Sequence, residues 1–120
     1  MTTRRSTRTP RRPAALRRGD VVRLRPRDRS GHEQQGERYA VVVQSDDLLP
    51  RSTVIVAPTS TVARPAGARP RVMVEGSETR VLVEQIVAVD TDRLGTVIAR
   101  LEADEMWAVD DALSFVLGLD

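Results

Sequence analysis

Residues 38–44 read Arg-Tyr-Ala-Val-Val-Val-Gln and give the clearest strand pattern in the chain. Three consecutive valines leave no polar position in the middle of this run, which indicates a strand buried on both faces and therefore central in its sheet. Other short runs rich in β-branched residues predict further strands. These cover residues 21–25, 53–57, 71–75, 80–84, 86–89 and 95–100.

Turn residues separate the predicted strands. Pro26 and Pro58 are expected to end two of them, because proline has no N–H to donate to a sheet ladder. Gly76-Ser77 is expected to supply a hairpin turn. The run 21–25 alternates only in part and suggests an edge strand.

The apolar spacing changes from two residues to helical after Leu101, which predicts an α-helix over 102–117. Gly118 is a natural stop for this helix. Short strands followed by one amphipathic helix indicate a mainly β fold, a small curled sheet or barrel with the helix packed beside it. The residues expected on the apolar helix face are Met106, Val109, Leu113, Val116 and Leu117.

The composition limits the size of the core and the possible chemistry. A chain of 120 residues with one Trp, one Tyr and one Phe supports a single small core, which favours completion by a partner or by dimerisation. Cysteine is absent, so disulfides, thiolate metal sites and cysteine nucleophiles are excluded, and a cytoplasmic location is expected. No segment has the apolar length needed to span a membrane.

The charge is divided unevenly along the chain. Residues 1–18 carry seven arginines and no acid, whereas residues 19–120 carry twelve arginines against seventeen acids. We therefore predict a disordered basic arm over 1–18 and one folded domain over 19–120. The arm is either a segment that attracts phosphate groups or a solvated tail without a binding role.

Candidate site residues gather where the predicted strands begin and end. A polar loop over 31–38 precedes the central strand, Ser60 and its neighbours follow the strand over 53–57, and Glu84 interrupts an apolar run. A buried acid needs a partner, so Glu84 is either part of a site or a structural acid bound to backbone or to an arginine. His32 and Glu33 alone do not make a metal site, so no metal is expected.

Taken in order, several segments resemble the MazF/PemK family of toxins from toxin–antitoxin systems. The resemblance covers residues 19–119, and the loop Gly-His-Glu-Gln-Gln-Gly over 31–36 is most similar to the PemK/Kid branch. Tyr39, Arg23 and Leu82 depart from the family pattern. The segments that carry the resemblance are 19–22, 31–38, 40–43, 56–60, 84–86 and 93–95.

The resemblance implies an SH3-like barrel, a symmetric homodimer, and metal-free and cofactor-free cleavage of single-stranded RNA such as mRNA. It also implies a MazE-like antitoxin whose C-terminal segment fills the RNA groove. By matching positions, the implied catalytic residues are Arg38, Ser60, Glu84 and His32, and the implied RNA-binding residues are Glu33, Gln34, Thr59, Thr61 and Gln85.

The implied reaction is attack of the ribose 2′-hydroxyl on its own phosphate, leaving a cyclic phosphate and a 5′-hydroxyl end. Arg38 suits the stabilisation of charge on the phosphorane, because its guanidinium can donate two hydrogen bonds to phosphate oxygens. Glu84, Glu33 or His32 could be the base. The alternative is a toxin of the same fold that binds without catalysis, like the gyrase poison CcdB.

Overall fold

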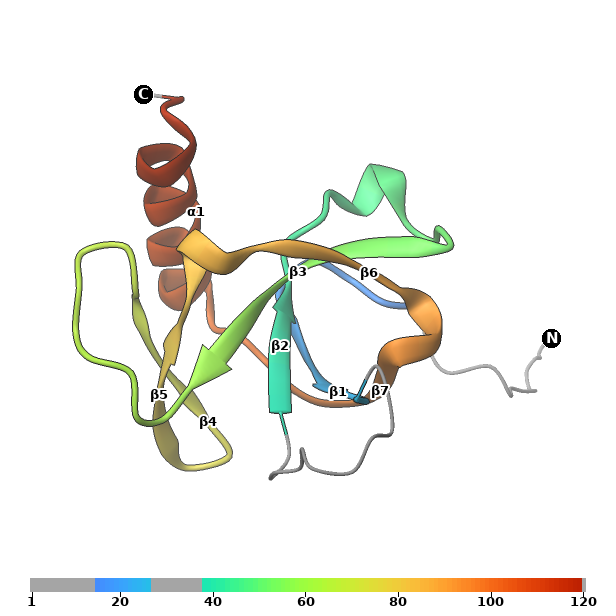
Figure 1. The fold of residues 1–120 in the computed structure, drawn as a ribbon, viewed down its shortest axis with the longest axis horizontal. Helices are drawn as coiled ribbons and strands as arrows, with labels where there is room; N and C mark the ends of the chain where they lie inside the picture. Colours follow the sequence, from blue (N-terminus) through green and yellow to red (C-terminus); the bar gives the residue numbers. More distant parts are fainter. Residues whose placement is uncertain (1–14, 27–37, 120) are drawn as a thin grey trace, which may run out of the picture.

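A computed structural model describes residues 15–26 and 38–119 of the chain. Antiparallel strands form a curled sheet in the order β4-β5-β3-β2-β1-β7, with β6 paired to β3 beside this path (Figure 1). One α-helix, α1 (Ala103–Leu117), follows the last strand. The strands are β1 (Asp20–Leu24), β2 (Arg38–Val42), β3 (Thr53–Ser60), β4 (Arg71–Val74), β5 (Ser77–Val81), β6 (Val87–Asp90) and β7 (Leu94–Arg100).

The predicted fold class, a mainly β fold with a small curled sheet or barrel and an amphipathic C-terminal helix, is confirmed. The run 38–44 is central as predicted, because β2 pairs with β1 on one side and β3 on the other. The expectation that residues 21–25 form an edge strand is wrong, since β1 lies between β2 and β7. The partial alternation of polar and apolar residues in this run does not show that β1 has a neighbouring strand on each side.

Strand β3 is longer than predicted and continues through Pro58 to Ser60. Pro58 lies opposite Ala40 of β2, and its carbonyl accepts a hydrogen bond of 2.8 Å from the N–H of Leu82. A strand residue directs its N–H and C=O to the same side, so the missing donor of Pro58 faces away from β2. The ladder between β2 and β3 therefore loses no hydrogen bond, and the prediction that Pro58 ends the strand is wrong.

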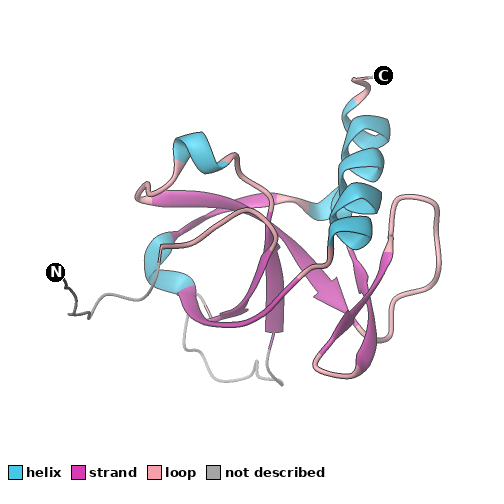
Figure 2. Cartoon of the chain, turned by 180° about the vertical axis from the view of Figure 1, so that it is seen from behind, coloured by secondary structure: helices cyan, strands magenta, loops and turns pink. Residues whose placement is uncertain are grey.

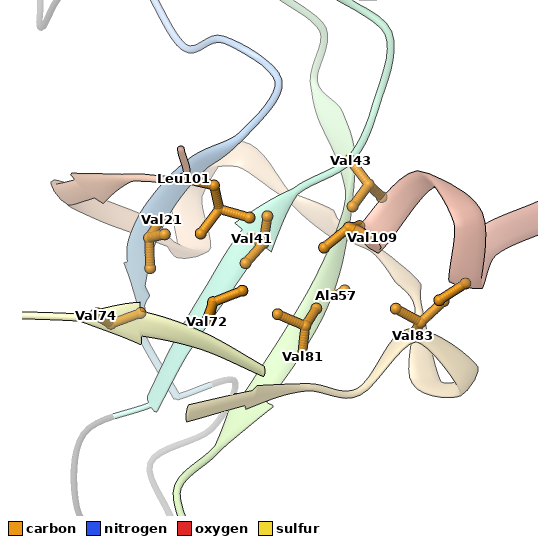
Figure 3. Packing of buried hydrophobic residues seen from close by; sticks show 11 residues of the cluster. Val21, Val41, Val43, Ala57, Val72, Val74, Val81, Val83, Leu101 and Val109 are labelled. Carbon is orange, nitrogen blue, oxygen red and sulfur yellow. The ribbon is translucent and has the colours of Figure 1, made fainter. Parts of the chain in front are cut away.

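Valines alternate between two apolar clusters on the two faces of the sheet. Val21 and Val41 belong to the cluster under the helix, whereas Val22 and Val42 belong to the cluster on the opposite face. All four are fully buried, which explains the uninterrupted valine run of β2. Figure 3 shows the side chains of the first cluster converging from the strands and from Val109 of α1.

The predicted helix over 102–117 is confirmed as α1, which begins one residue later than predicted. The carboxylate of Glu105 accepts a hydrogen bond from the N–H of Glu102, closing a capping box, and one from the N–H of Met73 in β4. Gly118 ends the helix with a φ of +70°. Figures 1 and 2 show the C-terminal part of α1 projecting away from the strands.

This projection corrects one part of the predicted apolar face of α1. Val109 is fully buried, and Met106, Leu113 and Val116 pack against the first cluster. Leu117, the last residue of α1, is 51% exposed.

Two predicted boundaries between β4 and the end of β5 are also wrong. The hairpin turn consists of Glu75 and Gly76, with φ of +51° and +82°, and Ser77 already belongs to β5 opposite Val74. Positive φ at both central residues is the type I′ arrangement that suits the twist of a hairpin. Strand β5 ends at Val81, and a 3-10 turn η3 (Val83–Gln85) replaces the strand predicted up to Glu84.

Residues 15–18 of the predicted arm contact the fold. The backbone N–H of Arg17 donates to the buried carboxylate of Asp20 at 2.8 Å. The side chain of Arg18 donates to the carbonyl of Val43 at 2.7 Å and pairs with Asp110 of α1 at 2.8 Å. The ordered domain therefore includes these residues, while residues 1–14 lie outside the described part of the chain.

Candidate functional site

A groove with a volume of about 550 Å³ lies where β2 begins, β3 ends and the β4–β5 hairpin turns. Figures 1 and 2 show these three parts at the same end of the molecule. The groove brings together residues far apart in the sequence because β3 pairs with β2 through residues 56–58 and with β5 through residues 59–60. Its lining residues are Arg38, Tyr39, Pro58, Thr59, Ser60, Thr61, Val74, Glu75, Ser77, Thr79, Leu82 and Gln85.

Arg38 is the one cation among the described residues that line the groove. It is the first residue of β2, its side chain is exposed, and it lies opposite Leu24 of β1. Within residues 15–26 and 38–119 it forms no ion pair. A fork of N–H donors at the mouth of a groove suits an oxyanion such as phosphate.

Hydroxyl groups lie beside this cation at the end of β3. The hydroxyl oxygen of Ser60 accepts hydrogen bonds from the N–H groups of Val62 and Ala63, at 3.1 and 3.0 Å. The oxygen of Ser60 thus holds the following turn, while its proton remains able to donate. The Thr59 hydroxyl donates to the carbonyl of Tyr39 at 3.1 Å, which ties the end of β3 to the start of β2.

Glu84 lies outside the groove lining, although the adjacent Gln85 belongs to it. Its carboxylate accepts hydrogen bonds of 3.0 and 2.7 Å from the guanidinium of Arg69, which itself donates to the carbonyl of Arg64. The hydrogen bond from Arg69 lowers the pKa of Glu84, which makes this carboxylate a weaker base. The expectation of a buried acid in a strand is wrong, because Glu84 is exposed on η3.

Three of the predicted site residues, His32, Glu33 and Gln34, lie outside the described residues. Their roles stay predictions. Within residues 15–26 and 38–119, no group of three His, Cys, Asp or Glu side chains is arranged to hold a metal ion.

Glu75, Ser77 and Thr79 of the β4–β5 hairpin also line the groove, and none of them was predicted from the sequence as a site residue. One signal was present: Ser77 and Thr79 are two residues apart in a strand and so share a face. Tyr39 also lines the groove, and the guanidinium of Arg23 lies 5.6 Å from the centre of its ring. These two positions, which both depart from the family pattern, are cross-strand partners and form a cation–π contact.

The comparison with protein families is decisive for residues 17–117, which match the model described as the PemK-like, MazF-like toxin of type II toxin–antitoxin systems. The chain belongs to this family. A Mycobacterium tuberculosis protein named "Putative toxin" is 44% identical over 104 residues, which is 85% of this chain and 97% of that protein. The resemblance seen in the sequence is thereby confirmed.

Solved structures of this family share the fold. The MazE–MazF complex of Deinococcus radiodurans (Form-II) superposes with a TM-score of 0.73 at 22% identity, covering 90% of this chain and 100% of that one. The Mycobacterium tuberculosis toxin MazF-mt6 gives 0.70 at 18% identity, covering 84% and 98%. An endoribonuclease in complex with its cognate antitoxin, from a mycobacterial species, gives 0.71 at 21% identity, covering 88% and 98%.

The described part of the chain contains no helix long and apolar enough to cross a membrane.

Proposed function

We propose that this toxin is an endoribonuclease that cleaves single-stranded RNA, such as mRNA, in the groove between β2, β3 and the β4–β5 hairpin. The observation that carries the proposal is that Arg38 and Ser60 line one groove although 22 positions separate them in the sequence. The mycobacterial protein of the same fold described as an endoribonuclease supports the same reaction class.

The residues of the groove match the needs of a reaction without a metal. Attack by the ribose 2′-hydroxyl concentrates negative charge on the phosphorane, and Arg38 supplies a cation with paired donors for its oxygens. The hydroxyl of Ser60 donates a hydrogen bond that orients a phosphate oxygen. The reaction leaves a cyclic phosphate and a 5′-hydroxyl.

The candidates for the general base differ in how readily their side chains can accept a proton. Glu84 is engaged by Arg69 and has a lowered pKa, so it is the weakest candidate. His32 titrates nearest neutral pH when unperturbed and is the strongest candidate on chemical grounds. Glu33 and Gln34 are proposed to contact the RNA from the same loop, together with Thr59, Thr61 and Gln85 of the groove.

A homodimer and a MazE-like antitoxin complete the proposal. The fully buried core consists largely of valines, while Trp107 and Phe115 of α1 are 69% and 70% exposed. Apolar surface of this kind is typical of a chain that associates with another. The related complexes with antitoxins support an antitoxin as a partner, and we propose that it blocks the groove. Light scattering at micromolar concentration should give twice the chain mass, and a monomer mass would contradict the dimer.

The test uses a long RNA in the presence of a chelator, with sequencing of the new ends. Arg38→Lys keeps the charge but loses the forked donors, so it should bind RNA and cut it roughly 10²-fold more slowly. Arg71→Lys is the matched control, because Arg71 is exposed on β4 and does not line the groove. RNA that stays whole with the parent protein would favour a toxin that binds without catalysis, and an Arg38→Lys rate close to the parental one would remove Arg38 from the reaction.

A further inference from the structure

Among the described residues that line the groove, Glu75 is the one acid, and the reaction proposed above does not use it. It lies at the tip of the β4–β5 hairpin, is exposed, and lines the groove with Arg38 and Tyr39. Its backbone φ of +51° is a conformation that side chains other than glycine, asparagine and aspartate rarely adopt. The type I′ turn of the hairpin requires this φ at its first central residue, so the turn itself fixes the backbone of Glu75 at the tip.

A carboxylate in a groove for RNA is repelled by the phosphates of its ligand. This repulsion is offset only by groups of the RNA that donate hydrogen bonds to the carboxylate. Phosphate groups have no donors at neutral pH, so the donors must come from a ribose hydroxyl or from the edge of a base. An ionised carboxylate accepts through both oxygens and donates nothing.

The base that matches two adjacent acceptors is guanine. Its Watson–Crick edge presents N1–H and the 2-amino group side by side, whereas the edges of adenine, cytosine and uracil each place an acceptor next to their donor. Sequence-specific proteins read such edges in unstacked, single-stranded RNA.

The groove has room and surface for a nucleotide between its charged walls. Arg38 and Glu75 both line it, and no ion pair joins these two described residues, so each can face a ligand in the groove. Val74 and Leu82 add apolar surface, and Tyr39 is an aromatic residue of the lining. Apolar and aromatic surface suits the faces of a base, while Arg38 suits its phosphate.

We propose that Glu75 is a specificity residue that reads a guanine of the RNA substrate, by accepting hydrogen bonds from N1–H and the 2-amino group. The proposal rests on the endoribonuclease function proposed above. The hairpin turn therefore determines which RNA sequences are cut, and Arg38 determines how fast.

The experiment compares the parent protein with Glu75→Gln on a pool of random RNA and on short labelled RNAs cut from its preferred sequence. Glu78→Gln is the matched control, because Glu78 lies on the same hairpin, pairs with Arg71 at 3.7 Å and does not line the groove. The labelled RNAs carry guanine, inosine or adenine at the preferred position, and inosine lacks only the 2-amino group.

The parent and Glu78→Gln should require guanine at one position and lose roughly ten- to a hundredfold in rate when it is replaced, the scale of one bidentate base contact. Glu75→Gln should lose this preference, cut the inosine and guanine RNAs alike, and melt at nearly the parental temperature. The proposal is overturned if the parent has no guanine preference, if Glu75→Gln retains it, or if Glu75→Gln slows the cutting of all RNAs equally. RNA left whole by the parent refutes the proposed function itself, and with it this role.

Discussion

Replacing Glu84 by glutamine separates the two roles that this residue could have, a catalytic acid and a structural partner of Arg69. The structure favours the structural role, because both hydrogen bonds from Arg69 end on one oxygen of Glu84. The two side chains are 26% and 35% exposed. Pairs with this exposure contribute little to stability, so Glu84→Gln should lower the free energy of unfolding by at most about 1 kcal/mol.

The pH dependence of this loss follows from the direction of the pKa shift. Folding lowers the pKa of Glu84, so the pair stabilises the folded chain above the unfolded pKa, which is about 4.3 for an ordinary glutamate. The stabilisation disappears as the pH falls through the lowered, folded-state pKa. The difference in unfolding free energy between the parent and Glu84→Gln should therefore be constant near neutral pH and vanish in acid.

Urea unfolding and RNA cleavage, measured on the same preparations, are the assay. Glu84→Gln should cut at nearly the parental rate, because its carboxylate is not part of the groove lining. Glu78→Gln breaks another exposed pair and controls for the change of charge. A loss of about 10²-fold or more in cutting, with unchanged stability, would refute this reasoning and restore Glu84 as a general acid or base.

Other perturbations test the core, the groove and the arm. Val109→Ala removes two methyl groups from a fully buried position and should cost about 2–3 kcal/mol in urea unfolding, and a loss below about 1 kcal/mol would mean that α1 packs loosely. Ser60→Ala should slow cutting and lower the melting temperature, whereas Ser60→Thr should restore both by keeping the oxygen that holds Val62 and Ala63. Deleting residues 1–14 removes five arginines and should weaken RNA binding at low salt, leaving the rate at saturating RNA unchanged. Slower cutting at saturation would show that these residues act in the reaction.

The sequence predicted the elements of the fold because their patterns are local. The valine run of β2 and the change to helical spacing after Leu101 each indicate which faces of the element are buried. The errors concern partners distant in the sequence. Pro58 continues a strand because Leu82 and Ala40 lie on opposite sides of it, and no local pattern records that arrangement.

The groove could be predicted only in part for the same reason. Arg38 and Ser60, which line it, were selected as candidates because they lie at the ends of recognisable strands and match the family pattern. Glu84 was placed in a strand because its apolar neighbours conceal the 3-10 turn, and its partner Arg69 lies fifteen residues away in a loop. Glu75 was not predicted to lie in the turn, because Gly76 and Ser77 were expected at its centre, one residue further along the chain.

The second hydrogen bond of Glu105 has a consequence for how the protein behaves at high concentration. Strand β4 lies at an edge of the sheet, and edge strands with free N–H groups offer pairing sites to strands of other molecules. Glu105 occupies the N–H of Met73 in the middle of this strand, and its negative charge there also repels an incoming backbone carbonyl. The acid that closes the capping box of α1 thus also protects the edge against intermolecular sheet growth, in a strand whose Met73 side chain is 54% exposed.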